Sequence, residues 1–209
     1  VYNGVAKIFR PHVEEDLILV LPRYQLLGKK YLLYIGTLEP RKNIERLIQA
    51  FYRLPPQWRK QYPLVLVGSK GWGSTKLEKL IHRLIKKEQL YYLGYVPEVD
   101  LPYLYSGAYA FLYLSLYEGF GLPVLEALAS GIPCITSNVS SIPEVVGKAG
   151  LLVNPWDVDA ITATLNRLIS DPVLQADLKR KGPVQAAQFS WQTCINNTID
   201  VYEGILASS

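Results

Sequence analysis

The sequence between Ala108 and Ala129 reads AYAFLYLSLYEGFGLPVLEALA and gives the clearest indication of the architecture. It opens with a continuous apolar run, Ala108–Leu114, which is typical of a strand buried on both faces of a sheet. A loop with two glycines, Gly119 and Gly121, then leads into an apolar helix at Pro123, a residue suited to a first helical turn. A buried strand that feeds directly into a helix predicts a parallel sheet with helical crossovers.

The same alternation extends in both directions from this stretch. Short apolar runs predict further strands at Tyr31–Ile35, Leu64–Val67, Leu90–Leu93, Cys134–Thr136 and Leu151–Val153. The intervening stretches predict helices at Lys76–Lys87, Leu101–Tyr105, Pro123–Ala129, Asp157–Ile169, Pro172–Gln188 and Trp191–Leu206, and a helical turn at Ile142–Val146. Of these, Lys76–Lys87 and Asp157–Ile169 are strongly amphipathic. Asn43 is expected to cap one more helix, and a first strand is expected near Leu17–Leu21. We therefore expect an α/β fold, a Rossmann-like doubly wound parallel sheet with helices on both faces.

Composition and charge narrow the class of protein. Of the 209 residues, 49% are apolar and 19% charged, as in soluble globular proteins. No apolar run reaches the roughly 18 residues of a membrane-spanning helix, and no signal peptide is recognised, so we expect a cytoplasmic protein. Cys134 and Cys194 show no metal-binding spacing and are expected to be thiols. The net charge of +4 favours anionic partners such as phosphates without choosing among them.

The loop that follows Leu114 carries the strongest candidates for chemistry. Ligands of open parallel sheets bind at the carboxyl ends of the strands, where the strand order reverses. The backbone N–H groups of Phe120, Gly121 and Leu122 would lie at a helix N-terminus and could bind phosphate. Glu118 and Glu126 are expected to face one cleft, where a carboxylate can accept two hydrogen bonds from a sugar diol. On spacing alone, an alternative interpretation has equal weight. In it, Glu118 is a solvated loop residue and Glu126 only complements the helix dipole.

The motif Glu118-x7-Glu126, with Gly-Phe-Gly-Leu-Pro between the two acids, resembles the signature of family-four retaining glycosyltransferases of the GT-B fold. Other segments that match the family are Asn3–Val5, Gly36–Asn43, Gly94–Pro97, Pro143–Val146 and Gly150–Val153. The resemblance covers nearly the whole chain. It implies that the fold is the C-terminal, donor-binding domain of a GT-B enzyme.

The resemblance also implies roles for individual residues. Glu118, Arg41 and Lys42 would be the catalytic set, with the two cations stabilising a departing diphosphate. The donor-binding set would be Glu126, Phe120, Gly121, Leu122, Gly119, Val96, Gly36 and Thr37. In that set Glu126 would hold the ribose hydroxyls. Many relatives carry an arginine at the position of Thr37, and Arg41 is expected to substitute for it.

The domain organisation follows the same resemblance. Residues 1–188 would form the nucleotide-sugar-binding domain, with 1–16 as the connector between two domains. Residues 189–209 would form a C-terminal helix that packs back toward an N-terminal domain absent from this chain. Because acceptor sites of GT-B enzymes lie largely on that other domain, we expect the chain alone to be inactive in transfer.

The expected function is donor binding in a retaining, metal-independent hexosyltransferase, with no cofactor and no nucleic-acid partner. The loop Gly36–Asn43 is similar to that of mannosyl-type enzymes of polysaccharide biosynthesis, which favours GDP-mannose as donor. The acceptor would be a glycan or a lipid-linked glycan. The resemblance allows peripheral contact of the full-length enzyme with the inner face of the membrane.

Two other functions stay open at this stage. One is a non-catalytic nucleotide-sugar sensor or scaffold with the same fold. The other is a nicotinamide oxidoreductase, but Gly68-x2-Gly71-x-Gly73 lacks the spacing of a dinucleotide motif.

Asp157-Val158-Asp159 resembles a metal-binding Asp-x-Asp motif. It opens an amphipathic helix, however, so Asp157 is better explained as an N-cap. We therefore expect no metal site.

Overall fold

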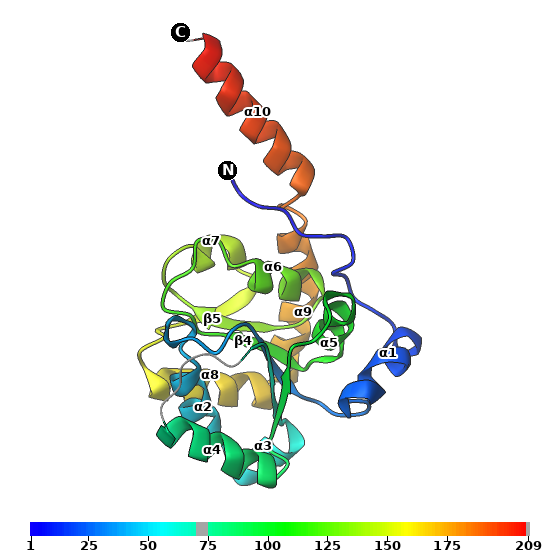
Figure 1. Ribbon diagram of the computed structural model, residues 1–209, viewed down its shortest axis with the longest axis vertical. Helices are drawn as coiled ribbons and strands as arrows, with labels where there is room; N and C mark the ends of the chain where they lie inside the picture. Colours follow the sequence, from blue (N-terminus) through cyan, green and yellow to red (C-terminus); the bar gives the residue numbers. More distant parts are fainter. Residues whose placement is uncertain (70–74, 208–209) are drawn as a thin grey trace.

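The fold is built on one sheet of six parallel strands. The computed structural model describes residues 1–69 and 75–207 (Figure 1). The strands are β1 (Leu32–Ile35), β2 (Leu64–Val67), β3 (Leu90–Gly94), β4 (Ala110–Tyr113), β5 (Cys134–Ser137) and β6 (Gly150–Val153). Their order in the sheet is β3-β2-β1-β4-β5-β6, and every pairing is parallel. The predicted doubly wound, Rossmann-like α/β fold is confirmed.

Helices cover both faces of this sheet. The helices are α1 (Glu14–Val20), α2 (Ile44–Arg53), α3 (Pro56–Gln61), α4 (Thr75–Lys86), α5 (Leu101–Gly107), α6 (Leu122–Ala129), α7 (Ile142–Val146), α8 (Val158–Ser170), α9 (Pro172–Ala186) and α10 (Trp191–Ala207). In Figure 1, α2, α4 and α8 lie on one side of the sheet and α5, α6 and α7 on the other. No helix among the described residues has both the length and the apolar character needed to cross a membrane.

The strands are buried because both faces are covered. Every residue of β2, β4 and β5 is buried, which explains why these strands read as continuous runs with little alternation. The largest fully buried side chains include the tyrosines Tyr31, Tyr34, Tyr105 and Tyr113. A buried phenol must find a hydrogen-bond partner, so these tyrosines fix polar contacts inside the core.

The prediction of a strand near Leu17–Leu21 is wrong. Those residues belong to α1 and to a short 3-10 helix, Leu21–Tyr24. The three acidic residues Glu14–Asp16 fill the first turn of α1, where they complement the helix dipole. Val20 is buried while Leu19 is exposed, so only one face of the apolar run packs on the core. The helix also begins inside the segment 1–16 that was expected to be a connector.

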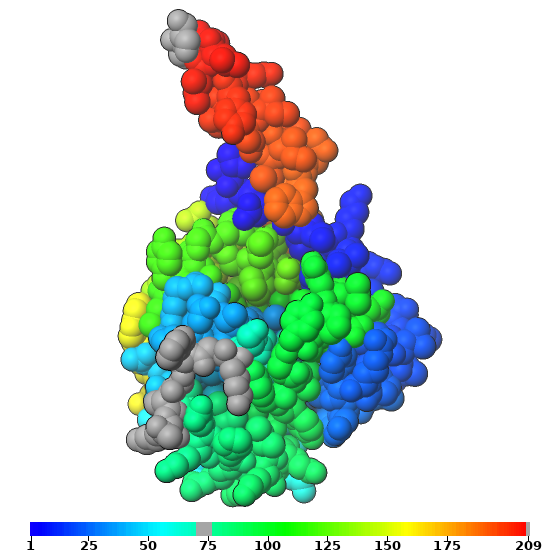
Figure 2. Space-filling view, in the orientation of Figure 1, coloured from blue at the N-terminus to red at the C-terminus, as the bar shows by residue number. Residues whose placement is uncertain are grey.

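The N-terminal connector packs on the segment between α9 and α10. Helix α10 extends away from the sheet, and the connector passes its base (Figures 1 and 2). Val5 donates its backbone N–H to the carbonyl of Phe189 at 3.3 Å, and the rings of Tyr2 and Phe189 lie 5.6 Å apart. None of the described residues of α10 is buried. Its expected packing against another domain stays a prediction.

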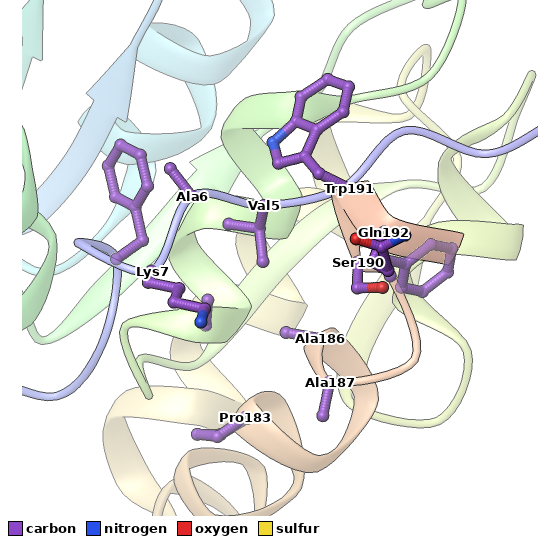
Figure 3. A pocket seen from close by; sticks show the side chains of 12 residues that line it. Val5, Ala6, Lys7, Pro183, Ala186, Ala187, Ser190, Trp191 and Gln192 are labelled. Atoms are coloured by element: carbon purple, nitrogen blue, oxygen red, sulfur yellow. The ribbon is translucent and has the colours of Figure 1, made fainter. Parts of the chain in front are cut away.

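A pocket of about 510 Å³ lies where the connector, the end of α9 and the start of α10 meet (Figure 3). Its lining residues are Val5, Ala6, Lys7, Phe9, Ala129, Pro183, Ala186, Ala187, Phe189, Ser190, Trp191 and Gln192. None of the residues predicted to bind a donor lines it. The pocket is therefore distinct from the candidate functional site described below.

Close packing of α9 on α6 gives a first testable prediction. A Cβ added at the helical residue Gly182 would lie 2.8 Å from the carbonyl oxygen of Leu128, on the facing helix α6. We expect Gly182→Ala to lower the free energy of unfolding by about 1–3 kcal/mol, measured by urea denaturation. Gly204→Ala is the matched control, because nothing lies within 4 Å of the added methyl group. It should be neutral or stabilising by up to about 1 kcal/mol. Equal effects of the two substitutions would contradict the packing argument.

Candidate functional site

The strand order reverses between β1 and β4, and the loops after these two strands join there. Leu116 donates its backbone N–H to the carbonyl of Arg41 at 2.9 Å. The Arg41 guanidinium in turn donates to the carbonyl of Tyr117 at 2.8 Å. The crevice outside such a reversal is where open α/β sheets bind ligands. The two loops predicted to carry chemistry therefore form one unit at the expected place.

Asn43 helps to join the loops after β1 and β4, a role that was not predicted from the sequence. Its side chain does not cap α2, and its backbone is left-handed with φ of 59°. The buried amide instead donates to the carbonyls of Leu114 at 3.0 Å and Pro155 at 2.7 Å. Because buried carbonyls need partners, Asn43 serves the loops around it instead of the helix it precedes.

Glu118 is the centre of a cluster of charged groups. Its Oε1 accepts hydrogen bonds from Lys42 Nζ at 2.7 Å and from the Tyr113 hydroxyl at 2.9 Å. Its Oε2 accepts from Arg41 Nη1 at 3.0 Å. The side chains of Glu118 and Lys42 are each only 10% exposed. Glu118 is therefore not a solvated loop residue, and the structure brings the three predicted catalytic residues together.

The hydrogen bonds keep Glu118 ionised. Burial alone would raise the pKa of this carboxyl group. The hydrogen bonds it accepts, led by the one from Lys42, outweigh burial and bring the pKa below its ordinary value. The carboxylate is thus a negative charge between the two cations at neutral pH.

Glu126 lies in a different environment, on α6. Its Oε2 accepts a hydrogen bond from the Tyr105 hydroxyl at 2.9 Å. Burial raises the pKa of Glu126 to about 7, even though this hydrogen bond favours the ionised form. Burial also raises the pKa of Tyr105 well above its ordinary value, so the phenol remains a donor. Glu126 is therefore a carboxyl group poised to change charge near neutral pH.

Aromatic rings connect the two acidic positions. The rings of Tyr113 and Phe111 lie 5.7 Å apart, and those of Phe111 and Tyr105 lie 5.3 Å apart. The two tyrosines that hold Glu118 and Glu126 thus belong to one packed row in the core. Sequence reasoning missed both tyrosines, although polar rings within apolar runs are a usable signal.

The start of α6 is open to a ligand. Gly121 has φ of 106°, and an added Cβ would meet Ile142 Cδ1 at 2.6 Å, so this turn requires glycine. Ser141 Oγ fixes the loop by donating to the carbonyl of Phe120 at 3.0 Å. The N–H groups of Phe120, Gly121 and Leu122 find no acceptor within residues 1–69 and 75–207. They are free donors at a helix N-terminus, which suits an anion.

The remaining predicted residues lie at the ends of other strands. Gly36 follows β1, and the carbonyl of Thr37 accepts a hydrogen bond from the Tyr34 hydroxyl at 3.0 Å. Val96 follows β3 with a buried side chain, which leaves its backbone as the part able to face a ligand. The motif from Gly68 to Gly73 lies largely outside the described residues.

The Asp157 motif is a helix cap, as predicted. Its side chain accepts a hydrogen bond from the backbone N–H of Ala160 at 2.9 Å, at the start of α8. In the part of the chain that the structure describes, no three His, Cys, Asp or Glu residues gather in a way that could hold a metal ion.

Comparison with known proteins defines the class. A family model described as glycosyl transferases group 1 matches residues 23–185. The match covers most of the chain, which therefore belongs to this family of glycosyltransferases. The expected resemblance to the C-terminal domain of a family-four GT-B enzyme is confirmed.

Several relatives transfer mannose according to their names. The chain is 48% identical to O-antigen chain mannosyltransferase B of Escherichia coli over 193 residues, 92% of this chain and 51% of that protein. It is 34% identical to MMP alpha-(1->4)-mannosyltransferase of Mycolicibacterium hassiacum over 196 residues, 92% of this chain and 47% of that protein. The chain thus spans about half the length of these relatives.

Solved structures agree on the fold. Sucrose-phosphate synthase from Thermosynechococcus elongatus matches with a TM-score of 0.81 and 28% identity, over 99% of this chain and 52% of that chain. Anabaena HepE, solved in complex with UDP and glucose, matches with a TM-score of 0.84 and 23% identity, over 97% of this chain and 56% of that chain. At that identity HepE supports the fold alone.

The environment of Glu126 predicts how stability depends on pH. Because the pKa is about 7 in the folded chain and lower in the unfolded chain, folding favours the protonated form. That contribution is complete below about pH 4.5 and is lost as the pH rises to about 7. In urea denaturation at pH 5 and pH 8, we expect Glu126→Gln to lose about 2 kcal/mol less stability than the wild type across this interval. Glu45→Gln, an exposed position on α2, is the control and should follow the wild type. A Glu126→Gln variant that also follows the wild type would refute the raised pKa.

Proposed function

We propose that this chain binds a nucleoside-diphosphate sugar as the donor half of a retaining, metal-independent hexosyltransferase. The observation that carries the proposal is the cluster of Arg41, Lys42 and Glu118 beside the open N-terminus of α6. Cations and free N–H groups suit a diphosphate, and carboxylates suit sugar hydroxyls. Both kinds of group stand after β1 and β4, between which the strand order reverses.

The chemistry follows from the charge that develops during transfer. When the bond between the anomeric carbon and the phosphate oxygen breaks, negative charge grows on the departing diphosphate. Arg41, Lys42 and the N–H groups at Phe120 to Leu122 would stabilise that charge. Each charge-assisted hydrogen bond contributes about 1.5–3 kcal/mol, so two or three of them lower the barrier substantially without a metal ion.

Glu118 would change partners when the donor binds. The two oxygens of Glu118 accept hydrogen bonds from Lys42, Tyr113 and Arg41. An arriving diphosphate competes for the two cations and frees lone pairs of the carboxylate. Hydroxyl groups of the donor hexose can then donate to those lone pairs. Glu118 would thus keep the cations in place before the donor arrives and bind the sugar afterwards.

Glu126 would hold the ribose. Tyr105 occupies Oε2, and Oε1 has no hydrogen bond to any described residue. A carboxylate with one oxygen fixed and the other available can accept from ribose hydroxyls at a defined angle. Val96 would contribute backbone contacts to the base.

The proposed donor is GDP-mannose, supported by the mannosyltransferase names of several relatives. The acceptor would be a glycan or a lipid-linked glycan held mainly by the amino-terminal half of a longer protein. In this proposal the chain alone does not transfer sugar, α10 packs on that other half, and the enzyme works at the cytoplasmic face of a membrane.

Ligand-induced stabilisation tests the proposal. A ligand that binds only the folded state stabilises it by RT ln(1 + [L]/Kd). We expect GDP at 1 mM to raise the melting temperature of the 209-residue chain, and UDP and ADP to raise it less. If no nucleoside diphosphate shifts the melting temperature when the ligand concentration is about 100 times the protein concentration, the proposed function is wrong.

Glu118→Gln gives a prediction with two opposite signs. Removing one negative charge beside the diphosphate should tighten binding of free GDP about tenfold. The substitution also replaces one carboxylate oxygen, an ionised acceptor of sugar hydroxyls, by an NH2 donor, which should lower the ratio of GDP-mannose affinity to GDP affinity about tenfold. Isothermal titration calorimetry measures both affinities. Glu39→Gln is the control, because Glu39 is 44% exposed and lies 3.7 Å from Arg41. It should change either affinity less than threefold. Equal changes for GDP and GDP-mannose in Glu118→Gln would exclude the sugar contact.

A further inference from the structure

Tyr113 has a polar group where the strand pattern needs only an apolar ring. It is the last residue of β4 and is fully buried. A phenylalanine would fill the same space without the penalty of burying a hydroxyl group. The presence of the hydroxyl group is therefore explained by the groups that it contacts.

The hydroxyl completes a triangle of three polar atoms. It donates to Glu118 Oε1 at 2.9 Å and accepts from Lys42 Nζ at 2.7 Å. Lys42 Nζ and Glu118 Oε1 are themselves 2.7 Å apart. A phenol has one donor and lone pairs to accept, so it can serve the carboxylate and the ammonium at once. No other buried tyrosine among the described residues bridges two charged groups.

The ring of Tyr113 is held firmly by the core. It stacks with Phe111 at 5.7 Å and with Tyr34 at 6.1 Å between ring centroids. Lys42 and Glu118, in contrast, come from loops after two different strands. Tyr113 thus joins both loops to the rigid sheet through hydrogen bonds to one hydroxyl group.

We propose that Tyr113 is a positioning residue that sets Lys42 and Glu118 for the diphosphate and the hexose of the donor. This inference rests on the function proposed above. When a diphosphate draws Lys42 away from Glu118, the hydroxyl still contacts both groups and limits how far each can move. Its contribution should therefore appear in binding of the diphosphate and should vanish when Lys42 is absent.

The test compares Tyr113→Phe with the wild type by calorimetry. The probes are the nucleoside diphosphate that most raises the melting temperature and its monophosphate. We expect the diphosphate to bind about tenfold more weakly and the monophosphate to change less than twofold. In a Lys42→Ala background, Tyr113→Phe should change diphosphate affinity less than twofold, because the group it positions is gone.

Tyr31→Phe is the matched control. Tyr31 is also fully buried, and its hydroxyl donates to the carbonyl of Leu104 at 2.7 Å, with no contact to the cluster. It should leave both affinities unchanged. Tyr113→Phe keeps the ring that packs on Phe111 and Tyr34, and circular dichroism checks its fold before the titrations. A Tyr113→Phe chain that does not fold would show that the fold itself needs the hydroxyl, which would also overturn a role limited to positioning.

The outcomes separate this inference from the function on which it rests. If the wild-type chain binds no nucleoside diphosphate, both the positioning role and the proposed function are wrong. Wild-type binding with no change in Tyr113→Phe overturns the positioning role alone. Equal weakening of diphosphate and monophosphate, or an effect that persists in Lys42→Ala, would show a general packing role and would also overturn it.

Discussion

The buried ion pair between Lys42 and Glu118 is the constraint on which the site depends. Removing two charges from water is unfavourable, and a buried pair is stable only when further hydrogen bonds satisfy its remaining atoms. Tyr113 and Arg41 supply those bonds. The pair therefore specifies one arrangement of the two loops more than it stabilises the fold. A single arrangement is what a binding site for a charged donor needs.

The topology of the sheet makes this pair possible. Lys42 and Glu118 are separated by most of three βα units, yet they follow neighbouring strands because β1 pairs with β4. The union of the loops is then completed by backbone contacts and by Asn43, whose amide joins the carbonyls of Leu114 and Pro155. Any change in strand order would separate the cations from the carboxylate. The site is thus a direct consequence of the reversal between β1 and β4.

Much of the fold could be predicted because buried parallel strands leave continuous apolar runs such as AFLY in β4. The failures have physical reasons. Leu17–Leu21 contains enough apolar residues for a strand, but the acidic turn before it and its one-sided burial make it a helix. Asn43 was predicted as a cap because its alternative partners are distant in sequence. Tyr113 and Tyr105 were missed for the same reason, since a hydroxyl acquires a role only once folding places a charge beside it.

The two acidic residues of the motif differ in charge state although both are partly or fully buried. Glu118 is ionised because donors surround it, whereas burial raises the pKa of Glu126 to about 7 with only the Tyr105 hydroxyl as a donor. In the proposed function, the anionic part of the ligand lies beside Arg41 and Lys42, and uncharged hydroxyl groups lie beside Glu126. A nucleoside-diphosphate sugar has that order of groups, with the diphosphate between ribose and hexose. The two carboxyl groups therefore suit the two different parts of the proposed ligand.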